Sequence, residues 1–546
     1  MPLTPRIFDT LVYLVQHHNE VVTKEELLRS IWPNVFVEEN NLTQSISALR
    51  RVLGERKGDH RFIVTVAGHG YRFAAPVTVS KAEAREQEKV TTIAVLPFKP
   101  LVTRDRDEAL ELGMADALIL RLSNNHQLIV RPITSVRRFT GLDQDAQAAG
   151  RELDVESVLD GSIQRSANRI RVNARLTNVA DGKGLWASTF DEEFTDVFTV
   201  QDAISERVAS ALKLSLNRDV LTKRFTVNTH AYELYVQGRY HWNKLIPSEV
   251  RKSVEFYKRA IEIDPNYALA YTGMAIAHIS FPISADVQPS DSFPQAKAAA
   301  LKALSLDETL ADAHAYLAFV KFWFDWDWTG AESELIRALD LNPNSAEAHR
   351  GYGILLSSLR SFQQAVEHGR RARQLDPLAL ITRANEAMFL YYAGELAEAE
   401  ECLKSTLELE PNFWVALLVL GKVYLQQEKQ GAAIEALTKA RDFCGGSSQP
   451  IGMLAFVYAL MDDRSRARSL LQELGVLAEK RYVPPYNFAL IHFGLNDREK
   501  VFEWLERAYE ARDVLLSAFI NSEPFWDRLR DEKRFRSLLK RMNLSK

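Results

Sequence analysis

Apolar residues recur at helical spacing between Val37 and Leu53, where the pattern of the chain is most regular. The positions i, i+4, i+7 and i+11, which share one face of a helix, hold Leu42, Ile46, Leu49 and Leu53. The opposite face holds Asn40, Gln44, Ser47 and Arg51. These polar side chains can donate and accept hydrogen bonds, as reading base edges in a DNA major groove requires. An ordinary amphipathic surface helix shows the same pattern, so the flanking segments decide between the two interpretations.

Two helices are predicted before this segment, and a β-hairpin after it. Pro5 suits the first position of a helix capped by Thr4. The apolar face predicted for this helix holds Phe8, Leu11, Val12 and Val15. A second helix starts at Thr23, which with Glu26 has capping-box form. Residues 61–66 and 71–73 read as strands joined by a glycine-rich turn, so three helices precede a hairpin.

The motifs LTPRIFDTLVYLVQHHNEVVTKEELLRSIW, ENNLTQSISALRRVLG and FIVTVAGHGYRF follow one another in this region. Residues 1–76 therefore resemble the OmpR/PhoB-type winged helix-turn-helix domain. The resemblance implies double-stranded DNA as a partner, with the third helix in the major groove and the hairpin as a wing. The residues it assigns to bases are Asn41, Thr43, Gln44, Ser47 and Arg51. Those it assigns to phosphate and to the wing are Arg50, His69 and Arg72.

The chain departs from this family at its start. The family usually begins with a small antiparallel sheet, whereas this sequence begins at the first helix, so the N-terminal sheet is expected to be missing. A shortened reading frame is the favoured explanation. No receiver domain is present, so we expect input from the C-terminal side. The acidic residues Glu25, Glu26, Glu38 and Glu39 fit either an RNA polymerase contact or a solvated loop.

Charge supports a local DNA contact only. The whole chain has 68 basic and 72 acidic residues, whereas residues 50–72 hold six basic residues against two acidic ones. Cys402 and Cys444 are the only cysteines, and no spacing suits a metal, so neither disulfides nor metal or other cofactors are expected. No apolar run could span a bilayer. These features predict a cytoplasmic protein without membrane contact, unlike CadC-like regulators, which carry a similar domain and a transmembrane segment.

A charged linker at 77–89 precedes a predicted α+β domain at 90–217. The pattern predicts strands at 92–98 and 128–131, a helix at 108–123, a meander at 155–190 and a closing helix at 197–216. The motifs IAVLPF, VLDGSIQRSANRIRVNARLTN, LWASTFD and FTVQDAISERVASAL resemble the TolB N-terminal and FlgO-like domains. This resemblance implies a non-catalytic coupling or ligand-sensing module. Gly161 and Gly182 are expected at turns, because no phosphate-binding motif surrounds them.

A 34-residue period dominates residues 222–546. Prolines repeat at Pro343, Pro377 and Pro411, and alanines at Ala331, Ala365, Ala399 and Ala433. This is the tetratricopeptide signature. Six or seven repeats and a C-terminal cap are expected to form an all-α solenoid, whose groove would bind a protein or peptide partner. The aromatic segment 322–328 is expected to pack between repeats and not to form a ligand site.

These features predict a multidomain protein: a winged helix-turn-helix (α+β) domain, a small α+β middle domain and an all-α tetratricopeptide solenoid. The leading functional hypothesis is a sequence-specific DNA-binding transcriptional regulator that senses a signal or partner through its C-terminal parts. Family resemblance adds a possible dimer on DNA. The alternative is an interaction scaffold whose winged helix no longer binds DNA. An enzyme is not expected, since no catalytic motif is present.

Overall fold

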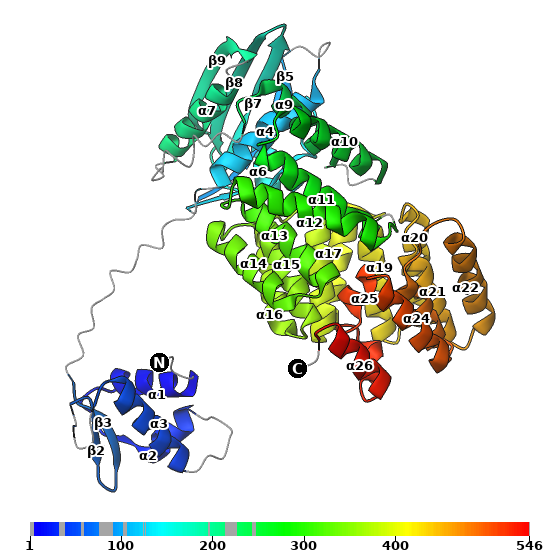
Figure 1. Cartoon of the computed structure of the whole chain (residues 1–546). Helices are drawn as coiled ribbons and strands as arrows, with labels where there is room; N and C mark the ends of the chain where they lie inside the picture. The colour runs from blue at the N-terminus through cyan, green and yellow to red at the C-terminus, as the bar shows by residue number, and fades with distance from the viewer. Residues whose placement is uncertain are drawn as a thin grey trace. The chain divides into compact units, whose positions relative to one another are not determined.

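The structure is a computed structural model of the chain. It describes residues 5–31, 39–55, 59, 61–75, 91–101, 106–123, 125, 127–194, 197–212, 226–242, 247–284 and 286–544. The chain separates into two compact units, Met1–Lys89 and Val90–Lys546 (Figure 1). Each unit is described by itself.

The first unit is a winged helix. Its helices are α1 (Pro5–Gln16), α2 (Lys24–Ile31) and α3 (Glu39–Val52). Its strands are β1 (Val22–Thr23), β2 (Ile63–Val66) and β3 (Gly70–Phe73), which pair antiparallel in the order β1-β3-β2. Leu42, Ile46 and Leu49 of α3 are buried in its core, which confirms the predicted apolar face.

Short-range contacts explain where these elements begin and turn. The Glu26 N–H donates to the Thr23 hydroxyl at 3.2 Å, so Thr23 caps α2 as predicted. Gly68 has a φ of +76° in the hairpin turn, a conformation that favours glycine. A Cβ at Gly70 would lie 2.0 Å from the carbonyl oxygen of Val22, so the close approach of β1 to β3 requires glycine there.

The buried face of α1 agrees in part with the predicted one, because Leu11 and Val15 pack against the core of this unit. Thr10 and Leu14 are completely buried, whereas Leu11, Val12 and Val15 are only half-buried. The side chain of Phe8 lies outside the described part of the structure. The apolar residues of α1 are numerous enough to define more than one possible buried face. The packing of α1 on α3 buries the face that contains Leu14.

A six-stranded sheet begins the second unit. Its strands are β4 (Thr91–Val95), β5 (Lys99–Pro100), β6 (Leu128–Val130), β7 (Ser157–Ser166), β8 (Arg169–Asn178) and β9 (Gly184–Glu193). They follow the order β6-β4-β7-β8-β9, with β5 beside β7. The β4 strand runs parallel to β6 and β7, and β7, β8 and β9 form the predicted antiparallel meander. The helices are α4 (Glu108–Ser123), α5 (Ile133–Val136), α6 (Ala146–Glu152) and α7 (Val197–Ala211).

One glycine prediction in this domain is wrong. Gly182 lies in a turn with a φ of +71°, but Gly161 lies within β7, opposite Ala174 of β8. A Cβ at Gly161 would lie 2.0 Å from the Asn173 carbonyl oxygen and 2.8 Å from the Phe98 ring. Close packing of Phe98 on the strand, and not a turn, therefore requires glycine at this position.

Antiparallel helix pairs build the rest of the second unit. In the described ranges eight pairs follow one another, more than the six or seven repeats expected. The pairs are α9 (Thr229–Trp242) with α10 (Pro247–Ile263), α11 (Ala268–Ser284) with α12 (Pro289–Leu306), α13 (Ala311–Val320) with α14 (Trp328–Leu341), α15 (Ala346–Ser358) with α16 (Phe362–Leu375), α17 (Leu380–Ala393) with α18 (Leu396–Leu409), α19 (Trp414–Gln426) with α20 (Gln430–Phe443), α21 (Gln449–Leu460) with α22 (Arg464–Ala478), and α23 (Pro485–Gly494) with α24 (Arg498–Glu510).

The periodic small residues lie where the paired helices touch. The repeated alanines are completely buried, and they are Ala331, Ala365, Ala399 and Ala433. Gly353 and Gly421 are separated by two periods of 34 residues. A Cβ on Gly353 would lie 2.5 Å from the Phe389 ring. The same addition to Gly421 would lie 2.6 Å from the Leu437 side chain. The 34-residue period therefore marks close helix contacts, as predicted.

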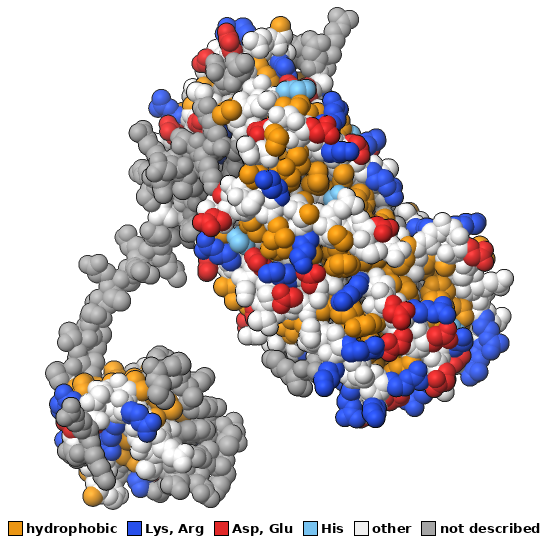
Figure 2. Space-filling view, in the orientation of Figure 1, with side chains coloured by type: hydrophobic (Ala, Val, Ile, Leu, Met, Phe, Trp, Pro, Cys, Tyr) orange, Lys and Arg blue, Asp and Glu red, His pale blue; other side chains and the backbone are white. Residues whose placement is uncertain are grey.

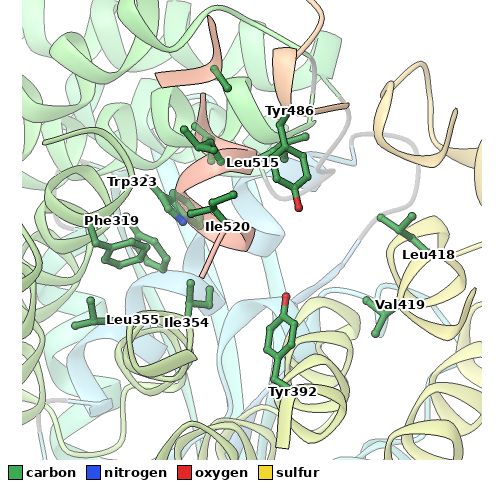
Figure 3. Close-up of a cluster of buried hydrophobic side chains, with 14 of the residues drawn as sticks. Phe319, Trp323, Ile354, Leu355, Tyr392, Leu418, Val419, Tyr486, Leu515 and Ile520 are labelled. Carbon is green, nitrogen blue, oxygen red and sulfur yellow. The ribbon is translucent and has the colours of Figure 1, made fainter. Parts of the chain in front are cut away.

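The C-terminal segment folds back into the array. It consists of α25 (Val514–Phe519), the 3-10 helix η4 (Pro524–Leu529) and α26 (Lys533–Arg541), and Figure 1 shows it beside helices from the middle of the chain. Glu523 pairs with Lys422 of α19 and accepts hydrogen bonds from Tyr391 at 3.2 Å and Tyr392 at 3.3 Å. Leu515 lies among side chains from several repeats in Figure 3. The segment therefore closes the inner side of the solenoid as well as capping its end.

The aromatic segment 322–328 packs as predicted, but its partner is the C-terminal segment. Its first part forms the π-helix η3 (Lys321–Asp325). The Trp326 Nε1 donates to the Ser517 hydroxyl at 2.7 Å, and the Trp328 Nε1 donates to the Met542 carbonyl at 2.7 Å. Both tryptophans are almost fully buried.

Charged side chains join the sheet domain to the repeats. The Arg131 guanidinium, beside β6, donates to the carbonyl oxygens of Gln374 at 2.7 Å and Leu375 at 3.1 Å. The hydroxyls of Thr134 and Ser135 donate to the buried Asp376 carboxylate, which follows α16. These contacts join residues more than 240 positions apart, so the two parts form a single unit.

Candidate DNA interface

The outward face of α3 is polar and exposed. Thr43, Gln44, Ser47 and Arg51 are all exposed. The Ser47 hydroxyl donates to the Thr43 carbonyl oxygen at 2.9 Å, one helical turn earlier. No described residue forms an ion pair with Arg51. The backbone of Asn41 belongs to α3, but its side chain lies outside the described part of the structure.

Arg50 lies at the edge of this face and joins α3 to the wing. Its Nη2 donates to the Ile63 carbonyl oxygen and to the Thr65 hydroxyl, each at 2.8 Å. Its Nε lies 3.4 Å from a carboxylate oxygen of Glu55. The Glu55 side chain is completely buried and accepts the backbone N–H groups of Phe62 at 2.5 Å and Ile63 at 3.0 Å. Arg50, predicted to face phosphate, is thus already bonded within the domain.

Glu55 positions the wing, although in the sequence it is only one of two acidic residues in a basic region. In the structure it orients both Arg50 and the first residues of β2, so it sets how the wing stands beside α3. In the sequence, Glu55 directly follows Gly54, where the helix ends. A carboxylate at such a position ordinarily faces solvent, so the sequence does not indicate that Glu55 is buried.

The wing presents two of the predicted side chains. His69 is exposed at the hairpin turn, with its Nδ1 3.1 Å from the Ala67 carbonyl oxygen. Arg72 is half-buried on β3, opposite Val64 of β2. At the base of the wing, Arg61 donates to Asp59 at 2.7 Å and to the Gly54 carbonyl oxygen at 3.1 Å.

These pairings reduce the positive charge that is free for a partner. Of the basic residues counted between positions 50 and 72, Arg50 and Arg61 are matched by Glu55 and Asp59. Arg56 and Lys57 lie outside the described residues. The visible face of this unit still shows Lys and Arg side chains among polar ones (Figure 2). Arg51 is the exposed cation on the polar face of α3.

The acidic residues expected to face a polymerase are partly described. Glu25 and Glu26 are exposed in the first turn of α2. A Glu26 carboxylate oxygen accepts a hydrogen bond from the Tyr13 hydroxyl at 3.2 Å. The side chains of Glu38 and Glu39 lie outside the described residues. Both interpretations of this acidic group therefore stay open.

Two family models match separate regions of the chain. Residues 1–73 match the family model described as "Transcriptional regulatory protein, C terminal". Residues 327–379 and 385–448 match the "Tetratricopeptide repeat" model. Of the helices in the described ranges, none combines the length and apolar composition that a membrane span needs. The TolB N-terminal and FlgO-like resemblance of the middle domain stays a prediction.

The related proteins align with different fractions of the chain. It is 24% identical over 399 residues to the "Transcriptional regulator HilA" of Salmonella typhimurium, covering 73% of this chain and 70% of HilA. It is 31% identical over 239 residues to a Rhizobium meliloti protein named "Putative adenylate cyclase 3". That alignment covers 42% of this chain and spans only 40% of the Rhizobium protein. The "Transcriptional activator CadC" of Escherichia coli is 34% identical over 98 residues, 18% of this chain and 19% of CadC.

The matched regions coincide with the described units. The N-terminal match ends at Phe73, the last residue of β3, and the repeat matches fall within the helix pairs of the second unit. The chain therefore carries an OmpR/PhoB-type winged-helix domain, the DNA-binding domain type of transcriptional regulators, followed by tetratricopeptide repeats.

Proposed function

We propose that this protein is a sequence-specific DNA-binding transcriptional regulator. The observation that carries the proposal is the polar face of α3, on which Thr43, Gln44, Ser47 and Arg51 are exposed. The wing is attached to the same helix through Arg50 and Glu55. Gln44 and Ser47 can read base edges, and Arg51 can bind guanine or phosphate. Asn41, His69 and Arg72 complete the proposed contact set.

In this proposal the second unit provides the input to the DNA-binding domain. Tetratricopeptide arrays commonly bind protein segments, and a protein partner is proposed here as well. The inner side of the array already holds α25, so a peptide would enter the groove only beside or instead of that helix. The proposed role of this unit is binding and not catalysis.

Two further contacts belong to the same proposal. The exposed carboxylates Glu25 and Glu26 are candidate contacts for RNA polymerase, and two copies of the winged helix would bind adjacent half-sites on DNA. A regulator of this kind acts where the bacterial chromosome lies, which is the cytoplasm.

The test is selection of binding sites from a randomised duplex DNA library by the full-length protein at two salt concentrations. We expect one discrete motif, with affinity that falls as salt rises. Arg51→Ala should lower the salt slope by about one if Arg51 binds phosphate, or relax one base position if it reads guanine. Arg464→Ala, which changes an exposed arginine of the second unit, is the matched control and should leave both unchanged.

Selection without a motif, or binding that salt does not weaken, would favour an interaction scaffold instead. The observation that favours the scaffold is that Arg50 and Arg61 are already paired within the domain. A Gln44→Ala variant that leaves the selected motif unchanged would remove α3 from sequence reading.

A further inference from the structure

A cavity of about 910 Å³ lies within the Val90–Lys546 unit. Three parts of the chain line it: α4 and α5 of the sheet domain, the first helices of successive repeat pairs, and α25. Its lining includes Phe319, Trp323, Leu418, Val419 and Leu515, and in Figure 3 the Leu515 side chain is drawn between the first two and the next two. The volume falls within the usual range of small-molecule sites, roughly 300–1,000 Å³.

Apolar and aromatic side chains form most of the wall. The aromatic side chains that line the cavity include Trp242, Tyr316, Phe319, Trp323, Trp414 and Phe519. Aromatic faces attract both apolar rings and cations, because the π-electron face carries partial negative charge. The wall therefore favours an apolar occupant and tolerates a positive charge on it.

Each cation in the wall already has a carboxylate partner. The pairs are Arg239–Asp116, Arg350–Glu347 and Lys422–Glu523. In the first pair, Nε and Nη2 of the arginine lie 2.7 and 2.8 Å from the two carboxylate oxygens, a bidentate arrangement. The paired groups cancel in charge, and none of these cations is left over to bind an anion.

Three other carboxylates line the cavity, and none forms an ion pair with a described residue. Asp376 accepts hydrogen bonds from the hydroxyls of Thr134 and Ser135, and Asp340 is exposed, whereas the half-buried Asp312 has no such partner. Asp312 lies in the first turn of α13 and lines the cavity. Among the described residues, no donor lies within hydrogen-bond or ion-pair distance of its carboxylate. Burial raises its pKa to about 6, with Arg239 opposing that rise and Glu347 and Asp116 adding to it. At neutral pH and above, the cavity thus holds an uncompensated carboxylate among aromatic side chains.

We propose that this cavity binds a small molecule that carries a protonated amine on an apolar or aromatic body. The amine bonds to the Asp312 carboxylate, and the body lies against the aromatic wall. Because the sheet domain, the repeats and α25 all line the site, an occupant can contact all three. This site goes beyond the proposed DNA binding and does not depend on it.

The test uses three fluorescent probes with one dansyl body and different chain ends. Dansylcadaverine ends in an amine, N-pentyl dansylamide ends in a methyl group, and N-dansyl-6-aminohexanoate ends in a carboxylate. Dansyl emission rises and shifts to shorter wavelength in an apolar site. Titration of the full-length protein at about pH 8, where Asp312 is ionised, gives a Kd for each probe.

We expect dansylcadaverine to bind at least about tenfold more tightly than the other two probes, equivalent to about 1.4 kcal/mol. Asp312→Asn, which keeps the shape of the side chain, should remove that preference and leave the Kd of the neutral probe within about twofold. The variant should also be at least as stable as the wild type, because it removes a half-buried charge that has no partner among the described residues. Asp462→Asn, at an exposed position, is the matched control and should change nothing.

Ala518→Trp places a ring in the cavity from α25 and should weaken all three probes. Equal binding of the three probes, tighter binding of the carboxylate probe, or no saturable binding by the amine would each overturn the proposal. So would an unchanged amine Kd in Asp312→Asn. These readouts do not involve DNA, so a negative result here leaves the proposed regulator function standing, and the reverse also holds.

Discussion

In both units, charged side chains join neighbouring structural elements, but the two units bury these charges to different extents. In the N-terminal unit, Arg50 joins α3 to the wing with about a quarter of its side chain exposed. In the second unit, Lys422 and Glu523 join α19 to the C-terminal segment with 7% and 0% of their side chains exposed. An exposed charge keeps its hydration when its partner is lost, whereas a buried one does not.

This difference matches what each unit has to do. A DNA-binding face must keep its polar side chains accessible, so the N-terminal unit can bury only the few charges that hold its wing. The second unit also places charges at the joints between its parts, where Arg239 pairs with Asp116 and the Asp376 carboxylate accepts hydrogen bonds from the hydroxyls of Thr134 and Ser135. We therefore expect the effect of removing one charge to follow its burial.

The largest effect is expected for Glu523→Ala. It leaves the Lys422 ammonium buried without a counter-charge and the Tyr391 and Tyr392 hydroxyls without their acceptor. The free energy of unfolding of the second unit should fall by about 3–5 kcal/mol. Urea denaturation of the full chain, followed by circular dichroism at its main transition, measures this.

Glu435→Ala is the control for that experiment, because Glu435 is 70% exposed and pairs with Lys439 one helical turn away. Its removal should leave the free energy of unfolding unchanged within the error of the measurement, because solvent screens an exposed pair. An equally small effect of Glu523→Ala would show that the C-terminal segment does not depend on its buried pair.

The next effect concerns pH and the joint between the sheet domain and the repeats. Burial raises the pKa of Asp376 to about 6, although the hydroxyls of Ser135 and Thr134 oppose that rise. The folded state therefore holds this proton more tightly than the unfolded state, whose pKa is near 3.8. The free energy of unfolding should therefore fall as pH rises from about 4 to about 6. Above that range Asp376 is ionised in both states, and the whole loss of stability is present.

Asp376→Asn removes this titration. Relative to the wild type, the variant should gain about 1–3 kcal/mol between pH 4 and pH 7. Urea midpoints measured across that range give the difference. Parallel curves for the two proteins would mean that Asp376 is ionised in both states throughout.

A smaller effect is expected for Arg50→Lys. Lysine keeps the charge but loses the two-pronged contact with the Ile63 carbonyl and the Thr65 hydroxyl. The wing should lose about 1–2 kcal/mol of local stability. Hydrogen exchange of peptides covering β2 and β3 in the full chain should then quicken by a factor of about 5–30. If exchange were unchanged and DNA binding were weaker, Arg50 would bind phosphate, as predicted from the sequence, and would not stabilise the wing.

The smallest effect is expected for Arg61→Ala in the same region. Its side chain is 61% exposed, although it contacts Asp59 at 2.7 Å and the Gly54 carbonyl oxygen at 3.1 Å. Exchange of the same peptides should change by no more than about twofold. If Arg61→Ala quickened exchange as much as Arg50→Lys, burial would not be what ranks these contacts.

Local spacing was enough to predict much of the architecture. Leu42, Ile46 and Leu49 share a buried face because a helix turns every 3.6 residues, and this requires no knowledge of the rest of the chain. The 34-residue period likewise located the helix contacts at Ala365 and Ala399. The α1 face was predicted only in part, since Leu11 and Val15 pack against the core but the fully buried residues are Thr10 and Leu14. Gly161 was misjudged because its partner, Phe98, lies 63 positions away in sequence, on another segment.

The sequence by itself therefore determined the elements, the outward polar face of α3 and the repeat period, since each depends on residues close together in the chain. Only the tertiary structure decided which charges are paired. Arg50 meets Glu55 and β2 because the chain turns after α3, and Glu523 meets Lys422 because the C-terminal segment returns to the array. Asp312 is left unpaired for the same reason, because only the path of the backbone sets which donors can reach it.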